Sequence, residues 1–135
     1  MISNRIIKKT NDNELEEITS IVVDCIFKVH KALGPGLLES AYETCLLYEI
    51  KKRDLKAVKQ KELPLIYEGV KLDAGYRIDI LVEDKLIVEI KASESLTDVH
   101  LAQVITYLKL SKNKLGLLVN FNVTLIKNGI KRVVV

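Results

Sequence analysis

Residues 76–92 read YRIDILVEDKLIVEIKA, and their pattern predicts a β-hairpin. Outside a polar connection at Glu83–Lys85, every even position from 78 to 90 is apolar, whereas the odd positions include Asp79, Glu89 and Lys91. Successive side chains of a strand point to opposite faces of the sheet. We therefore expect one apolar face, which carries the even residues, and a second face on which the three charged residues lie.

The register of this hairpin follows from the same pattern. The two faces match across the strands only if even residues pair with even residues. A three-residue connection achieves this with Val82 opposite Leu86, and Asp79 then lies opposite Glu89. Directly opposite residues have Cβ atoms about 4.5–5.5 Å apart, so the two carboxylates are expected to converge, with Lys91 on the same face.

Asp79 and Glu89 would repel each other at this separation unless a positive group lay between them. Magnesium suits that position, because Mg²⁺ binds one or two carboxylates and keeps several waters. Lys91 adds a point charge that could hold a phosphate. The alternative is a surface ion-pair cluster on a solvated face, which would contribute little. Leu81 and Ile87 share the odd face, so we expect that face to be partly covered, where charges need partners.

Three helices and further strands are predicted around the hairpin. The helices show apolar residues at spacings of three and four, and the strands are short apolar runs bounded by turn residues. The predicted helices cover residues 14–33, 37–53 and 97–110, and the further strands cover 63–67, 115–120, 123–126 and 130–135. This order predicts an α/β fold in which helices flank a mixed central β-sheet. Residues 14–135 are expected to form one domain, preceded by a polar N-terminal arm of residues 1–13.

The composition is that of an ordinary globular domain. The chain has 135 residues, of which 48% are hydrophobic and 29% charged, so it can bury a core without a disulfide or a structural metal. The net charge of +3 permits nucleic acid binding without arguing for it. Cys25 and Cys45 form no CxxC pair, which argues against a zinc site and favours buried free thiols in the cytoplasm. No apolar run approaches the roughly 20 residues that span a bilayer, so no membrane partner is expected.

Three motifs resemble those of a known nuclease superfamily. Asp79, followed by Glu89-Ile90-Lys91, resembles the Asp…Glu-x-Lys arrangement of the PD-(D/E)xK superfamily, although no proline precedes the aspartate. The segment GLLESAY at 36–42 resembles the signature of its GxxExxY family, and QVITY at 103–107 is similar to the QxxxY motif of the exonuclease branch. The three motifs stand in the expected order along the chain.

The resemblance implies a restriction-endonuclease-like core and a nuclease activity that depends on Mg²⁺ or Mn²⁺. It also implies four catalytic side chains, which are Glu39, Asp79, Glu89 and Lys91. The metal would be held by Asp79, Glu89, Glu39 and the backbone carbonyl of Ile90. Lys91 would position or activate the attacking water.

By the same resemblance, Gln103 and Tyr107 would bind the substrate, which is nucleic acid, with DNA expected ahead of RNA. From the residues alone, both side chains are predicted to lie on ordinary surface, and His100 to be a partly exposed helix residue. Tyr42 is predicted to be a core tyrosine, whereas His30 belongs to the family pattern without an assigned physical role. The candidates for phosphate contacts are Lys51, Lys52, Arg53, Lys109, Lys112 and Lys114.

Two other functions fit the same residues. The chain could be a non-catalytic binding module for nucleic acid or protein on a nuclease-like fold, acting through a protein partner or as a homodimer. It could also be a small structural protein whose carboxylates are simply ion-paired. Metal binding distinguishes the nuclease from the structural protein, and turnover of an oligonucleotide distinguishes the nuclease from the binding module.

Overall fold

The computed structural model describes the backbone of residues 4–135 and the side chains of residues 13–135. Its helices are α1 (Asn4–Leu33), α2 (Glu39–Lys52) and α3 (Asp98–Ser111), with a short 3-10 helix η1 (Ile126–Asn128). Its strands are β1 (Ala57–Glu62), β2 (Leu65–Tyr67), β3 (Val70–Leu72), β4 (Arg77–Val82), β5 (Leu86–Lys91), β6 (Leu115–Asn120) and β7 (Ile130–Val134). The predicted arm, 1–13, lies partly outside the described residues, and α1 begins at Asn4, ahead of the predicted helix start at residue 14.

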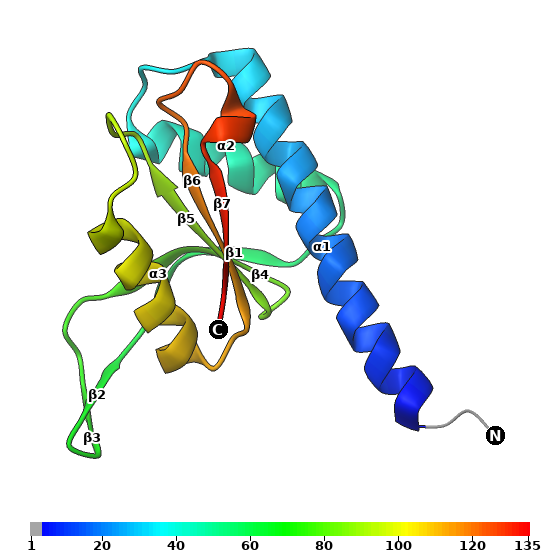
Figure 1. Cartoon of the computed structure of the whole chain (residues 1–135), viewed down its shortest axis with the longest axis vertical. Helices are drawn as coiled ribbons and strands as arrows, with labels where there is room; N and C mark the ends of the chain where they lie inside the picture. The colour runs from blue at the N-terminus through cyan, green and yellow to red at the C-terminus, as the bar shows by residue number, and fades with distance from the viewer. Residues whose placement is uncertain (1–3) are drawn as a thin grey trace.

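A five-stranded mixed sheet forms the centre of the molecule, in the order β1-β4-β5-β6-β7. Strands β5 and β6 run parallel, and the other neighbouring pairs run antiparallel. Figure 1 shows α3 on one side of the sheet and α1 on the other, with the separate β2–β3 hairpin projecting away from both. The predicted α/β fold, a mixed central sheet flanked by helices, is therefore confirmed, and it is consistent with a restriction-endonuclease-like core.

The hairpin β4–β5 has the predicted register. Val82 pairs with Leu86, Leu81 with Ile87 and Ile80 with Val88. The even strand residues Ile80, Val82, Leu86, Val88 and Ile90 pack into the core beneath α1 and α2. On the other face, Leu81 and Ile87 pack into a smaller core beneath α3. The odd face is therefore covered, as its apolar residues predicted.

The alternation fails at one even residue, Ile78. This side chain packs with Leu63 and Leu81 beneath α3 instead of with the other even residues. The exception coincides with an interruption of the β1–β4 ladder, which pairs residues 59 with 80 and 61 with 78 but leaves out Gln60 and Asp79. Gln60 has a left-handed backbone with a φ of 54°, so the sheet is kinked beside Asp79.

The strands differ from the prediction in four places, one of which is β3, a strand that was not expected. Strand β1 was not expected, because its sequence AVKQKE is mostly polar. In the structure, five of its six residues are exposed. This suits an edge strand, in which one side of the backbone pairs only with water. The predicted strand 63–67 shortens to β2, which pairs with β3 outside the main sheet. The predicted strand 123–126 is wrong, because residues 122–125 form bends and the 3-10 helix η1 begins at Ile126.

Cys25 is buried and Cys45 is half-buried, and both thiols are free. The prediction of buried free thiols is thus confirmed for Cys25 and only in part for Cys45. Within the described residues, no helix combines the length and the apolar character that a bilayer span requires.

Candidate active site

Asp79 and Glu89 meet where β4 and β5 part. The backbone ladder of the hairpin ends at the pair Ile80 and Val88. Beyond it, the amide of Asp79 donates to Glu89 Oε2 at 2.8 Å, and the amide of Ile90 donates to Asp79 Oδ2 at 2.8 Å. The two carboxylates thus replace the backbone partners that the diverging strands have lost, and both point into the gap between the strands.

Burial dominates the electrostatics of these two carboxyl groups. Glu89 is only 2% exposed, and this burial, together with the neighbouring Asp79, raises its pKa to about 8. Burial also raises the pKa of Asp79, against the opposing effects of the Ile90 amide and the Lys91 charge. In a buried site, a charged form is disfavoured until a positive group compensates it. The pair is therefore suited to a cation.

Helix α2 brings two further carboxylates toward this pair. Glu39, at the first position of α2, accepts a hydrogen bond from the Ala92 amide at 3.1 Å. Glu43 lies one turn later, and burial and the charges of Asp79 and Glu39 raise its pKa. Glu43 was not predicted from the sequence, although its spacing of four from Glu39 places both on one face of a helix.

Gln60 of β1 links α2 to the hairpin, and it was also missed. Its side-chain amide donates to Glu43 Oε2 at 2.8 Å and to Asp79 Oδ1 at 3.3 Å. Only the antiparallel pairing of β1 with β4 brings this residue beside Asp79. No pattern within AVKQKE indicates that contact.

Lys91 begins a series of three hydrogen-bonded side chains on the face of the sheet that α3 covers. Its ammonium group donates to Gln103 Oε1 at 3.0 Å, and Gln103 Nε2 donates to the Tyr107 hydroxyl at 3.3 Å. Tyr107 is only 5% exposed, so the prediction of ordinary surface is wrong for it. The buried residues of α3 are Val104, Tyr107 and Leu108. Burial and the charges of Glu89 and Asp79 raise the pKa of Tyr107.

His100 lies at the start of α3 and is not part of this hydrogen-bonded series. Its Nδ1 accepts a hydrogen bond from the Thr97 amide at 3.1 Å, while the Thr97 hydroxyl accepts one from the His100 amide. This reciprocal arrangement caps the helix. The predicted role of a partly exposed helix residue is confirmed.

Tyr42 holds the loop that leads into α2. Its hydroxyl donates to the Gly34 carbonyl at 2.6 Å and accepts from the Leu37 amide at 3.1 Å. The ring is fully buried and stacks on Phe121, with centroids 4.4 Å apart. The prediction of a core tyrosine is confirmed, and the contacts show that it also fixes the chain just before Glu39.

His30 and Asn120 fix the segments on either side of Phe121. A ring nitrogen of the buried His30 lies 2.8 Å from the Val123 carbonyl. The buried amide of Asn120 accepts from the Ser93 amide and donates to the Ser93 carbonyl, which anchors the chain two residues after Lys91. Both residues therefore position the site without belonging to it, and the role of Asn120 was not predicted from the sequence.

The residues present fit a metal ion with few protein ligands. Among the described residues, no three carboxylate, imidazole or thiolate side chains form a metal-binding group. Glu89 uses one oxygen on a backbone amide and keeps the other as a ligand, whereas Asp79 accepts from the Ile90 amide with one oxygen and from Gln60 with the other. A carboxylate oxygen has a second lone pair, so Asp79 can still bind a cation. Two carboxylates with several waters are what Mg²⁺ accepts. Glu39, which is held on the Ala92 amide, remains a predicted ligand.

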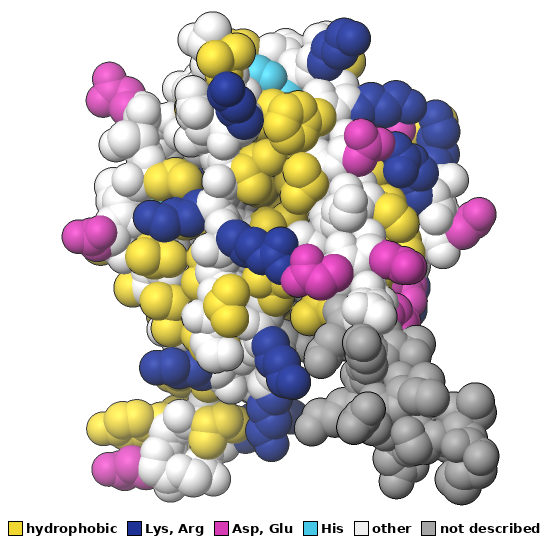
Figure 2. Space-filling view, turned by 45° about the vertical axis from the view of Figure 1, so that its right-hand side comes forward, with side chains coloured by type: hydrophobic (Ala, Val, Ile, Leu, Met, Phe, Trp, Pro, Cys, Tyr) yellow, Lys and Arg dark blue, Asp and Glu magenta, His cyan; other side chains and the backbone are white. Residues whose placement is uncertain are grey.

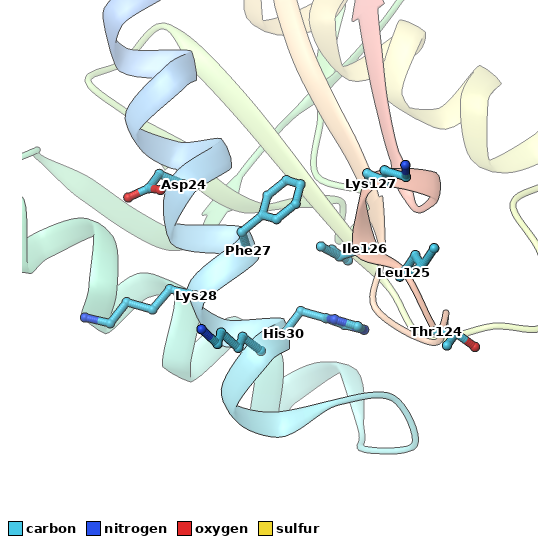
Figure 3. Close-up of a pocket in the computed structure, with 9 residues that line it drawn as sticks. Asp24, Phe27, Lys28, His30, Thr124, Leu125, Ile126 and Lys127 are labelled. Atoms are coloured by element: carbon cyan, nitrogen blue, oxygen red, sulfur yellow. The ribbon is translucent and has the colours of Figure 1, made fainter.

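A separate cavity of about 500 Å³ lies between α1 and the η1 region. Figure 3 shows Phe27, Leu125 and Ile126 in it, and Figure 2 shows apolar side chains gathered on this face beside basic ones. None of the predicted site residues lines this cavity. It is distinct from the carboxylate site.

Two of the basic residues that were candidates for phosphate contacts are engaged in ion pairs. Arg53 pairs with Asp24, and Lys52 lies 3.9 Å from Glu49. The Arg53–Asp24 pair and Lys52 are largely exposed, whereas the Glu49 side chain is only 16% exposed. Exposed ion pairs contribute little to stability. The two pairs leave these basic side chains less available to a phosphate than the sequence indicated.

Comparison with known proteins adds one finding. A family model described as the PD-(D/E)XK nuclease superfamily matches residues 16–133. No curated protein and no solved structure matches the chain significantly. The matched range includes all of the strands β1–β6 and each of the carboxylates described above.

Proposed function

The chain belongs to the PD-(D/E)XK nuclease superfamily, and from this premise we propose that it is a metal-dependent nuclease of the GxxExxY family. The superfamily implies a nucleic-acid substrate, and the proposed reaction is hydrolysis of its phosphodiester bonds. One observation carries the proposal: Asp79 and Glu89 hold each other's strands at the point where the hairpin opens, with Lys91 two residues beyond. A merely solvated face would not bury Glu89 at 2% exposure.

Asp79, Glu89 and the backbone carbonyl of Ile90 would hold Mg²⁺ or Mn²⁺, with Glu39 as an additional acidic group. When bound, such an ion neutralises phosphate charge and makes a coordinated water a better nucleophile. Glu43 and Gln60 support these groups and are not themselves proposed as ligands. Gln60 donates to both Glu43 and Asp79, so it fixes the orientation of the Asp79 carboxylate.

Lys91 positions the substrate in this proposal. Its ammonium group is held by the neutral oxygen of Gln103, so its positive charge is not cancelled by a salt bridge there. A lysine ammonium is a compact charge that can hold a phosphate oxygen and orient a water. Tyr107 in turn holds Gln103, which makes the tyrosine a positioning residue.

The proposal extends to DNA as the substrate, bound mainly through phosphate contacts and therefore with a steep dependence on salt. In this proposal, a second copy or a protein partner would supply further contacts. The two free thiols fit a reducing cytoplasm.

A titration with Mn²⁺ tests the proposal directly. We expect wild type to bind Mn²⁺ and to cleave a labelled oligonucleotide, and Asp79→Asn to lose both properties. Asp84→Asn is the matched control, because Asp84 lies on the same hairpin but is exposed in its turn and pairs with Lys56. Metal binding and oligonucleotide binding without turnover would indicate a binding module instead. A wild type that neither binds metal nor cleaves DNA or RNA would contradict the proposal.

A further inference from the structure

A pocket of about 330 Å³ lies beside the candidate active site, between α3 and the chain around β2. Its walls include Leu65, Tyr76, Val99 and Leu110, together with Gln103 and Tyr107 of the site itself. A volume of this size is typical of small-ligand pockets. The function proposed above does not use Leu65, Tyr76 or Val99.

Gln103 joins this pocket to the active site. Its side-chain oxygen accepts from Lys91, and its nitrogen donates to Tyr107, whose ring forms part of the pocket wall. A group bound in the pocket therefore lies one side chain away from the ammonium that would hold the phosphate. A nucleotide has the same arrangement, because its uncharged base lies next to its charged phosphate.

The pocket is built for an uncharged, flat group. None of the residues that line it is charged, so a phosphate would find no counter-charge inside. The rings of Tyr76 and Tyr107 lie edge to face, with centroids 6.2 Å apart. Gln103, Thr106 and the Tyr107 hydroxyl supply polar groups along one wall. Apolar walls with a few polar groups suit a nucleobase, which has a π-face and hydrogen-bonding edges.

Tyr76 offers the stacking surface. It is 46% exposed, although its backbone is fixed, because its carbonyl accepts from the Leu63 amide at 2.9 Å. An aromatic ring that is anchored in the chain but open to solvent is a platform on which a base can stack. A base inside a duplex is stacked on both sides and presents only its edges, so only an unpaired base can use such a platform.

We infer that this pocket binds an unpaired nucleobase of the substrate next to the phosphate held by Lys91. The substrate class is then single-stranded nucleic acid, and Tyr76, Val99 and Leu65 are binding residues that determine this preference. The inference rests on the proposed nuclease function for the position of the phosphate.

Tyrosine fluorescence tests the pocket without any cleavage. The chain has no tryptophan and five tyrosines, so a base that stacks on Tyr76 quenches part of the total emission. We expect a short oligothymidylate to quench wild type in EDTA, and Tyr76→Ala to bind it about tenfold more weakly. Val99→Asp should weaken binding similarly by placing a carboxylate at the pocket. Tyr48→Ala is the matched control, since Tyr48 is 62% exposed on α2 and lies outside the pocket.

A cleavage assay distinguishes this inference from the proposed function. Wild type should cleave a single strand at least tenfold more efficiently than the same sequence in a duplex, and Tyr76→Ala should raise KM for the single strand more than it lowers kcat. Equal cleavage of both forms, with Tyr76→Ala behaving like Tyr48→Ala, would overturn the inference and leave the nuclease function standing. Oligothymidylate binding that depends on Tyr76, without cleavage, would support the pocket and remove the nuclease function. Binding of apolar peptides in place of oligothymidylate would overturn the inference.

Discussion

At its turn end, the β4–β5 hairpin is held by a backbone ladder between buried aliphatic residues, whereas at its open end it is held by carboxylates. Val82 and Leu86 at the turn end are both fully buried and pack under α1 and α2. At the open end, Asp79 and Glu89 take over hydrogen bonds that backbone groups would otherwise make. The difference indicates that the turn end of the hairpin contributes stability, whereas the open end carries the proposed chemistry.

The largest expected effect concerns the open end. Lys91→Ala should lower metal-dependent cleavage about a thousandfold, because it removes the charge that stabilises the phosphate in the transition state. The urea midpoint of unfolding should change far less than the activity, since Lys91 is half-buried and its hydrogen bond is to the neutral oxygen of Gln103. Lys85→Ala is the matched control at the turn end, where Lys85 pairs with Glu14 at 3.1 Å. Equal activity in the two variants would erase the contrast between the ends.

The second effect concerns the turn end. Leu86→Ala should reduce the free energy of unfolding by about 3 kcal/mol, because Leu86 is fully buried and its truncation leaves a cavity. Affinity for Mn²⁺, measured under conditions where the variant is folded, should be unchanged. A loss below about 1 kcal/mol, or a comparable loss of metal affinity, would show that the two ends are not separate.

The smallest expected effect is a gain in stability at the open end, and it depends on the pKa of Glu89. Without metal, the pKa of Glu89 is raised from 4.5 to about 8 in the folded chain. Between these values the folded chain retains a proton that the unfolded chain has lost. The free energy of unfolding should therefore decrease as pH rises through this range and level off above the folded pKa.

Glu89→Gln should remove this dependence, because a neutral amide can accept from the Asp79 amide without a buried charge. We expect the variant to be about 1–2 kcal/mol more stable than wild type above pH 8 in EDTA, by urea unfolding, although it lacks cleavage activity. Asp84→Asn should show no such gain, since Lys56 lowers the pKa of Asp84. A Glu89→Gln variant that is less stable than wild type at that pH would contradict the view of a stability cost at the open end.

The hairpin and its register could be predicted from the sequence because alternation and loop length are local properties. The pairing of Val82 with Leu86, and the register that follows from it, could be predicted without information from the rest of the chain. The site residues Asp79, Glu89 and Lys91 followed from the same local pattern. Their roles as metal ligands and as a phosphate contact remain predictions.

The contacts that cross between elements could not be predicted in this way. Gln60 reaches Asp79 only through the pairing of an edge strand whose polar sequence hides it. Asn120 anchors Ser93 only because β6 lies parallel to β5. Tyr107 was assigned to the surface because the aliphatic residues of its helix predict a buried stripe that does not include it. These residues are Leu101, Val104, Ile105 and Leu108. In each case the missing information was the relative position of two segments far apart in the chain.

The left-handed backbone of Gln60 has a consequence for how this site is maintained. A residue with a Cβ atom in that conformation bears strain of about 1 kcal/mol that glycine would not bear. Glycine at this position would relax the chain but would remove the amide donor shared by Glu43 and Asp79. The kink beside Asp79 therefore couples local strain to the orientation of a carboxylate, and a relaxed backbone here would leave two acidic groups without their common donor.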